Sequence, residues 1–338
     1  MDMTQDMTLD IPLDRGHLPA TIEAPLPVAL ADQVSDLQRA SKAANTLRAY
    51  GSDLRLFADW CARHGRGHLP ATPETVAAYV ADHAGLWKVS TLARRVAAIS
   101  TAHRLAGLVN PCATATVSAT LSGLRRANRK PRRQAAGLLR DDMRALLDHL
   151  AGDTTLAGWR DRALLLVGWC AGLRRSELGA LTWGQVEQDP GGLRLLVIGN
   201  KTDKTGEGRT IGLAYDDPGV CPVRALLDYR AQLSRVDRGL VADSAPVFPR
   251  LNRWGQVQGR MSGQAVAAML QRRALAAGLV RHYTGHSLRV GLVQEGKLQG
   301  VEDSAVMATT GHKQVTMLRT YQGDAGVVSR AAHRGLLS

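Results

Sequence analysis

A short run of cations divides this 338-residue chain into two parts with different sequence patterns. Between Arg125 and Arg133 it carries six cations, one proline and no acid. Like charges repel and proline interrupts a helix, so this run cannot form part of a packed core. We predict that residues 127–137 are a linker between two domains, since the chain is longer than one typical domain. The linker is either a solvated spacer or a segment that lies along a phosphate backbone, and the two interpretations are compatible.

Residues 36–126 have the period of amphipathic helices. Apolar side chains recur at steps of three and four in 46–61, 76–80 and 92–103, which predicts an all-helical domain. Thr72 followed by Pro73 predicts one helix start, and Ser90 is expected to cap another helix. Residues 1–35 have weak periodicity, so we expect a flexible N-terminal arm with at most one short helix near 28–37.

Residues 138–338 mix helical and strand patterns. Residues 193–198 and 210–214 are expected to pair as a hairpin around a polar, glycine-containing turn. Helices are predicted over 138–150, 159–171, 222–233, 262–277, 286–295, 303–309 and 316–321. The predicted fold class is therefore mainly α with a small β-sheet: an all-helical N-terminal domain followed by an α+β domain.

Charge and cysteine content narrow the function classes. The chain holds 43 Lys and Arg against 30 Asp and Glu, a net charge of +13, and most of the cations are Arg. Such an excess indicates a polyanionic partner, usually nucleic acid, although a genome that favours Arg codons would produce the same bias. The four cysteines lack zinc-ligand spacing, and no run is apolar enough to span a membrane. We expect a protein of a reducing compartment, with no metal site, no membrane contact and no signal peptide.

Several polar residues of the second part suit a phosphoryl site. Arg174 lies in a tight turn between Gly172, which can end one helix, and Ser176, which can cap the next. His286 and Arg289 are three residues apart and so share one face of a helix. Each feature alone is more often a solvated charge or a packed ring. Lys201 or Lys204 in the hairpin turn, His312 and Tyr321 complete the set.

Together these residue types fit one reaction. Two arginine forks and two imidazoles can surround a pentavalent phosphoryl group and neutralise its charge. A lysine can give a proton to the leaving oxygen, and Tyr321 can be the nucleophile. Because the ordinary pKa of tyrosine is about 10, Tyr321 needs a nearby base or positive field.

The ordered motifs resemble those of the tyrosine recombinase (phage integrase) family. The resemblance extends over residues 40–325 and includes the Gly-Leu-Arg174-x-Ser-Glu177-Leu motif, the hairpin lysine, Gly-His312 and Tyr321. The stretch HSLRVG from His286 is similar to that of Cre-type recombinases. The phrase Asn-Lys-Thr-Asp favours Lys201 over Lys204 as the hairpin lysine.

This resemblance implies a site-specific recombinase that cleaves and rejoins double-stranded DNA through a 3′-phosphotyrosyl intermediate on Tyr321. It implies that Arg174 and Arg289 bind the phosphate, supported by Glu177. His286 would act as base or acid, His312 would hydrogen-bond the phosphate, and Lys201 would protonate the 5′-oxygen. No cofactor is implied.

The resemblance also implies an assembly. The helical core-binding domain and the catalytic domain would form a C-shaped clamp around DNA. Four copies would assemble on paired sites, and the free protein would be a monomer or a dimer. Accessory DNA-bending proteins could take part. The location would be cytoplasmic, at the nucleoid. The tail after Tyr321 has an apolar pattern that fits docking either on a neighbouring protomer or on its own domain.

Two alternatives share the motifs: a type IB-like topoisomerase or telomere resolvase, and a catalytically silent DNA-binding protein. For DNA contact we expect cations and amides on the linker and on two helices, where they could bind phosphate or read bases. These candidates are Lys88, Arg94, Arg95, Arg132, Arg133, Gln264, Arg272 and Arg273.

Overall fold

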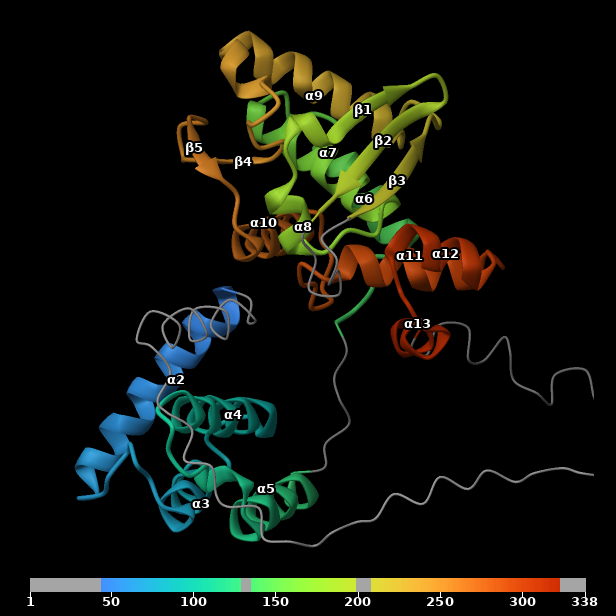
Figure 1. The fold of residues 1–338 in the computed structure, drawn as a ribbon. Coiled ribbons are helices and arrows are strands. Elements are labelled where there is room, and N and C mark those ends of the chain that lie inside the picture. Colours follow the sequence, from blue (N-terminus) through green and yellow to red (C-terminus); the bar gives the residue numbers. More distant parts are fainter. Residues whose placement is uncertain (1–43, 129–134, 199–207, 323–338) are drawn as a thin grey trace, which may run out of the picture. The chain divides into compact units, whose positions relative to one another are not determined.

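The computed structural model describes residues 44–128, 135–198 and 208–322 (Figure 1). For residues 44, 45 and 319–322 it describes the helical backbone and not the side chains. The predicted N-terminal arm, most of the basic linker, the tip of the predicted hairpin and the tail after Tyr321 lie outside the described residues. The chain divides into two compact units, and the boundary along the chain falls between Pro131 and Arg132, inside the predicted linker.

The described part of the first unit is helical. Its elements are α2 (Ala44–Arg63), α3 (Pro73–Asp82), α4 (Val89–Leu105), the 3-10 turn η1 (Pro111–Ala113) and α5 (Ala115–Ala127). Thr72 caps α3 as predicted, because its hydroxyl accepts a hydrogen bond from the Thr75 amide at 3.2 Å. The predicted cap by Ser90 is wrong: α4 begins at Val89 with Lys88 as its N-cap residue, and the Lys88 carbonyl accepts its first backbone bonds.

Aromatic rings fill the core of the first unit. The Tyr79 ring meets those of Phe57 and Trp60 edge-on, with centroids 5.0 and 5.4 Å apart. The Arg95 guanidinium lies 3.2 Å above the centre of the Trp87 ring and donates to the Tyr79 hydroxyl at 2.7 Å. This core forms without side chains of the second unit.

The described part of the second unit combines helices with two small sheets. Its helices are α6 (Arg140–Leu150), α7 (Leu156–Cys170), α8 (Arg175–Ala180), α9 (Pro222–Val236), α10 (Gly263–Ala276), α11 (Ser287–Leu298), α12 (Asp303–Thr310) and α13 (Val315–Gln322), with 3-10 turns η2 (Trp183–Gln185) and η3 (Arg238–Val241). Its strands are β1 (Val186–Asp189), β2 (Gly192–Val197), β3 (Arg209–Ala214), β4 (Pro249–Leu251) and β5 (Val257–Arg260).

The predicted hairpin is present as the antiparallel pair β2–β3. Leu195 lies opposite Ile211, and Val197 lies opposite Arg209 at the end of the pair. Alternation places Leu193, Leu195 and Val197 on the buried face of β2. The additional strands β1, β4 and β5 were not predicted. They are three or four residues long and largely exposed, so they lack an apolar alternation that would identify them.

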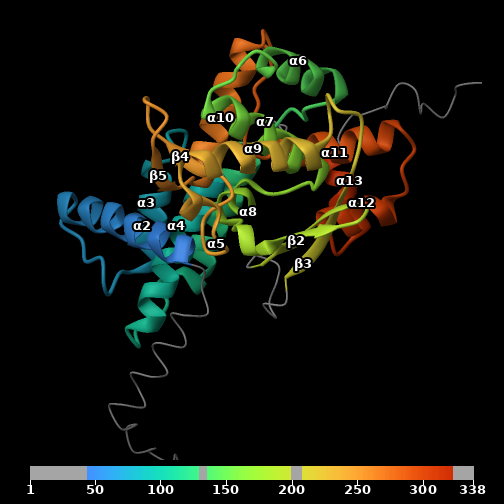
Figure 2. The same ribbon diagram turned by 90° about the horizontal axis from the view of Figure 1, so that it is seen from above.

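Helix α7 lies at the centre of the second unit and packs against α9 (Figure 2). Four consecutive apolar residues, 164–167, are buried, so this part of the helix is enclosed by the core on all sides. Tyr229 of α9 stacks on Phe248 with ring centroids 6.2 Å apart. This core fixes the position of the turn between α7 and α8, where Arg174 lies.

The last three helices form a small cluster of their own (Figure 2). Val293 of α11, Val306 of α12 and Leu318 of α13 are buried against one another, with Met307 partly buried beside them. Helix α12 also contacts β3. The cluster therefore connects the helix that carries Tyr321 to the helix that carries Arg289.

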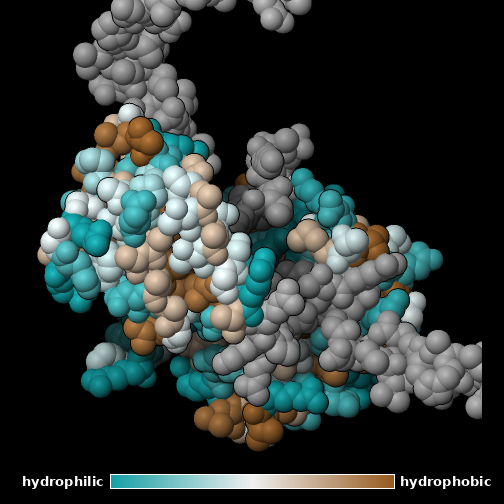
Figure 3. Space-filling model, turned by 90° about the horizontal axis from the view of Figure 1, so that it is seen from below, coloured by the Kyte–Doolittle hydropathy of each residue, from teal (hydrophilic) through white to brown (hydrophobic). Residues whose placement is uncertain are grey.

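On the face drawn in Figure 3, apolar residues form small, separate patches in a mostly hydrophilic surface. Exposed apolar side chains such as Val109, Val280 and Leu86 lie far apart in the sequence, and single ones are normal on protein surfaces. Among the described helices, none is long and apolar enough to cross a bilayer.

Candidate active site

A glycine turn holds Arg174 at the corner between α7 and α8. Gly172 follows α7 with φ +55°, and a Cβ at this position would lie 2.8 Å from the Thr310 side chain and 2.9 Å from that of Leu292. The close packing and the positive φ both require glycine. Ser176 does not cap α8 as predicted, because α8 begins at Arg175 and Arg174 is its N-cap residue.

Glu177 performs the capping instead. Its Oε2 accepts from the Arg174 backbone amide at 2.8 Å, and its Oε1 accepts from Arg174 Nη1 at 2.6 Å. The Arg209 guanidinium donates to the two oxygens of the same carboxylate, at 3.1 and 3.0 Å. Burial alone would favour the neutral acid, but the hydrogen bonds from Arg209 and Arg174 outweigh it and hold the pKa of Glu177 below its ordinary value. Glu177 is therefore a buried carboxylate shared by two arginines.

Arg289 reaches the same corner from α11. Its side chain is fully buried, and its Nη1 donates to the Gly172 carbonyl at 2.8 Å. Its Nη2 lies 3.1 Å from His312 Nε2. A guanidinium can only donate, so Nε2 of His312 is the acceptor and carries no proton in this arrangement.

Thr310 fixes the other side of the His312 ring. The Thr310 hydroxyl donates to the Val306 carbonyl at 2.6 Å, so it accepts from Nδ1–H of His312 at 2.8 Å. Burial and the positive charges of Arg289 and Arg174 lower the pKa of His312 to about 4. His312 is therefore neutral at pH 7, with its tautomer set by Thr310 and Arg289.

His286 lies just before α11, at the wall of a pocket. The pocket has a volume of about 390 Å³ and is lined by Arg174, Arg175, Ser176, Thr284, Gly285 and His286. Burial, then Arg289 and Arg174, lower the pKa of His286. A neutral imidazole beside two arginines can accept a proton without weakening the binding of an anion.

The structure thus gathers five of the predicted site residues around one corner: Arg174, Glu177, His286, Arg289 and His312. For Tyr321 it describes the backbone of α13, which is attached to α11 through Leu318. Lys201 and Lys204 lie outside the described residues. Among the described residues, no three His, Cys, Asp or Glu side chains gather into a group that could hold a metal.

The predicted DNA contacts divide into exposed and internally bound residues. Lys88, Arg94, Gln264 and Arg272 are exposed, and Arg94 also pairs with Asp53 at 3.2 Å. Arg132 and Arg133 lie outside the described residues. Arg95 is buried among Tyr79, Trp87 and Asp53, so we withdraw it as a DNA contact.

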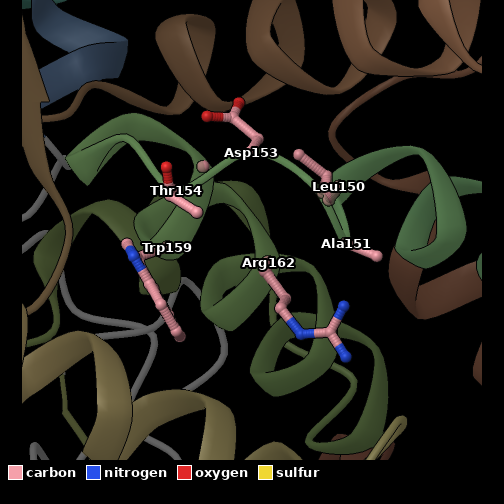
Figure 4. A pocket seen from close by; sticks show the side chains of 7 residues that line it. Leu150, Ala151, Asp153, Thr154, Trp159 and Arg162 are labelled. Atoms are coloured by element: carbon pink, nitrogen blue, oxygen red, sulfur yellow. The ribbon is translucent and has the colours of Figure 1, made fainter.

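Arg273 is withdrawn for a similar reason. Its guanidinium bonds to Asp161 and Asp153, both at 2.9 Å. Figure 4 shows the Asp153 side chain beside a pocket of about 180 Å³, whose lining also includes Trp159 and Arg162. No local pattern indicates this pairing, because both acids lie more than a hundred positions before Arg273 along the chain.

Arg209 and Thr310 are site residues that the sequence analysis missed. For Thr310 we find no signal in the sequence. For Arg209 one existed: it is in phase with Ile211 and Leu213, the buried residues of its strand. An arginine at an apolar position of a strand pattern indicates a buried partner.

The fold consists of a helical unit followed by an α+β unit. The second unit gathers two arginines and two histidines and carries a tyrosine on its last described helix. These features define a class of DNA-cleaving enzymes. The model "Phage integrase family" matches residues 137–325, and "Phage integrase, N-terminal SAM-like domain" matches residues 34–106. The chain belongs to the phage integrase family and is a tyrosine recombinase, an enzyme that breaks and rejoins DNA.

Relatives in sequence are also named as recombinases of this family. The chain is 33% identical over 287 residues to an "Integrase/recombinase xerD homolog" of Selenomonas ruminantium, which covers 83% of this chain and 82% of that protein. It is 30% identical over 305 residues to "Tyrosine recombinase XerD" of Caulobacter vibrioides, covering 88% of this chain and 92% of that protein.

Solved structures share the fold. A XerH site-specific recombinase bound to difH DNA matches with a TM-score of 0.59 at 14% identity, covering 91% of this chain and 84% of that one. A lambda integrase dimer bound to a core site matches with a TM-score of 0.57 at 18% identity, covering 88% of this chain and 77% of that one. The predicted family and the predicted fold class are therefore confirmed.

Proposed function

We propose that the chain is a site-specific recombinase whose Tyr321 hydroxyl attacks a scissile phosphate. The O–P bond to Tyr321 forms as the bond to the 5′-oxygen breaks, which leaves a 3′-phosphotyrosyl DNA end and a 5′-hydroxyl. Rejoining reverses these two changes on a new 5′-hydroxyl. One observation carries this proposal: Arg174, Arg289, His286 and His312 converge on one corner that is linked to the Tyr321 helix.

Charge at this corner favours a phosphoryl group. Arg174, Arg209 and Arg289 supply three positive charges and Glu177 one negative charge, so the group has an excess of two. A transferring phosphodiester gains charge on its non-bridging oxygens, which pre-oriented arginine forks stabilise. In this proposal Arg174 and Arg289 bind those oxygens.

Proton transfers complete the reaction. Neutral His286 takes the Tyr321 proton, and Lys201 gives a proton to the departing 5′-oxygen. His312 steadies Arg289 through Nε2 in the DNA-free arrangement. When Arg289 turns toward the phosphate, His312 donates to the same phosphate after its proton moves to Nε2.

The assembly that we propose has two units closing on double-stranded DNA as a C-shaped clamp, with residues 36–126 binding DNA, 127–137 as the linker and 138–338 as the catalytic domain. Two structural relatives are described as a lambda integrase dimer on a core site and a lambda integrase tetramer on a Holliday junction. By analogy, four copies of this chain would exchange strands on paired sites in the nucleoid, with accessory DNA-bending proteins where the sites require them. Lys88, Arg94, Arg132, Arg133, Gln264 and Arg272 remain the DNA contacts that we propose.

A covalent-adduct assay tests this function. Nicked suicide duplexes cut from DNA that flanks the gene are incubated with wild type and with Tyr321→Phe, then separated on a denaturing gel. We expect a slow, protease-sensitive adduct with wild type and none with the variant, while both bind DNA. An adduct that persists in Tyr321→Phe would refute Tyr321 as nucleophile, and binding without any wild-type adduct would favour a silent DNA-binding protein.

Strand exchange separates the recombinase from a topoisomerase or telomere resolvase. Two differently labelled duplexes with the cleaved site are incubated together with wild type. Joined products with both labels are expected for a recombinase. Relaxation of supercoiled DNA or closed hairpin ends, without doubly labelled products, would favour the alternatives.

A further inference from the structure

Arg209 is the first residue of β3 and lies on the strand's buried face. Its side chain is 13% exposed and shares its face with buried Ile211 and Leu213. The exposed face of the same sheet carries Arg194 of β2 instead. A cation that points into a domain needs a partner that offsets the loss of water.

That partner is the Glu177 carboxylate, described above, and its four acceptor positions are all used. A carboxylate offers about four lone-pair sites. Arg209 takes two of them through its guanidinium fork, and Arg174 takes two through its backbone amide and Nη1. A fork matches a carboxylate better than a single contact, so Arg209 holds Glu177 in a fixed orientation.

This sharing has a consequence for Arg174. Because Arg209 occupies the fork geometry, Arg174 meets Glu177 through Nη1 and remains on the wall of the pocket beside His286. Without Arg209, Arg174 can turn and form the fork with Glu177 itself. Its guanidinium would then point away from the phosphate position.

Arg209 also touches the turn that carries His312. A Cβ built on Gly311 would lie 3.0 Å from Arg209 Cδ and 3.3 Å from Arg209 Nε, and Gly311 has φ +70°. The Arg209 side chain therefore lies against the residue just before His312. The Arg209 side chain therefore contacts both α8 and the turn before His312. Arg209 is also the first residue of β3, the strand that follows the segment with Lys201.

We propose that Arg209 is a positioning residue of the strand-cleavage site, which orients Arg174 through Glu177 and braces the His312 turn. The proposal rests on the proposed function above. It assigns Arg209 no contact with DNA; its effect passes through Glu177 and Gly311.

Cleavage rates provide the first test. Arg209→Met, Arg209→Lys and the control Arg194→Met are compared with wild type on nicked suicide duplexes at saturating DNA. Arg194 makes exposed ion pairs with Glu187 and Asp189 on the opposite face of the sheet, so its replacement removes the same charge. We expect Arg209→Met to form adduct about 100-fold more slowly, the size of effect that a misplaced catalytic group produces. Arg209→Lys, which keeps the charge and loses the fork, is expected about 10-fold slower, and Arg194→Met should match wild type.

The pH profile provides a readout that a merely structural role would not change. Among the described residues, the charged and titratable groups at this corner are Arg174 and Arg175 beside α8, Arg209 of β3, His286 and Arg289 at the start of α11, and His312. Removal of Arg209 leaves Glu177 buried with one arginine, so its protonation moves to higher pH. The Arg209→Met rate should then fall on the acid side at a pH where wild type keeps its rate. Glu177→Gln in the Arg209→Met background should abolish this acid limb.

Three results would overturn the inference. Adduct formation by Arg209→Met at the wild-type rate excludes a positioning role, and a slower rate with an unchanged pH profile indicates loss of packing alone. If Arg209→Met does not fold by circular dichroism, Arg209→Lys carries the test, and a wild-type rate in that variant refutes the need for the fork. If wild type binds DNA without forming adduct, the proposed function itself is refuted. This outcome differs from failure of the Arg209 inference, because in that case wild type still forms adduct.

Discussion

At the scale of single residues, the site is a cluster of buried and half-buried arginines beside neutral imidazoles. Arg289 is 0% exposed and finds a carbonyl and an imidazole as its partners. Neither of these two acceptors carries a full negative charge. The charge of Arg289 is one reason why His286 and His312 stay neutral, since a second cation beside Arg289 would be repelled.

The low pKa of His312 makes stability depend on pH. Its pKa is about 4 in the folded chain and 6.5 ordinarily. Between these values the unfolded chain binds a proton that the folded chain does not, so stability is complete above pH 6.5 and decreases as pH falls toward 4. We expect this residue to account for a loss of about 3 kcal/mol over that window. Urea unfolding of DNA-free wild type and His312→Gln from pH 7 to pH 4 measures it: the variant should lose less stability than wild type, and equal losses would contradict the assignment.

At the scale of elements, α13 is attached to its unit through a small hydrophobic cluster. Leu318 is buried with Val293 and Val306 in a cluster separate from the main core of its unit. A small cluster stabilises a helix less than a full core does and allows local opening. Movement of α13 would change the distance between Tyr321 and the arginines.

Leu318→Ala should therefore impair cleavage more than global stability. Removal of a buried leucine costs about 2–5 kcal/mol, and the cost should appear as release of α13. We expect adduct formation to fall at least about tenfold, with earlier proteolytic cleavage near α13 and a nearly unchanged melting temperature. Met317→Ala on the same helix is the control, because Met317 is exposed; an equal effect of both variants would argue against the anchor.

Helix positions were also the most predictable elements. The predicted bounds of the helices from Pro222 onward agree with the structure to within three residues, because caps, prolines and apolar period are local signals. The β2–β3 hairpin was predicted from its alternation. Strands β1, β4 and β5 escaped prediction because pairing with a neighbour, and not their own sequence, keeps them extended.

At the scale of the whole molecule, the two units have separate cores. Phe57, Trp60 and Tyr79 pack within the first unit, and no residue of the second belongs to that cluster. A domain with its own core can fold by itself. The division falls within the basic run from which the two-domain organisation was predicted.

A fragment of residues 36–131 should therefore fold on its own. We expect a helical circular dichroism spectrum and one cooperative thermal transition, because the aromatic core lies entirely within the fragment. Tyr79→Ala should abolish the transition, since it removes a fully buried ring. A fragment without a cooperative transition would show that the first unit depends on the second.

The sequence by itself determined the two-part organisation, the helices and the set of candidate site residues, because period, caps and ordered motifs are written in local stretches of chain. It also placed Arg174 in a tight turn and His286 with Arg289 on one helix. Only the tertiary structure decided which partners the charged residues have. Arg209 and Arg174 share Glu177, and Arg289 donates to His312. Arg95 and Arg273 bond to residues inside the protein. Those partners come from residues distant in the chain, and hydrogen bonds between such residues depend on the packing of whole elements, which no local pattern encodes.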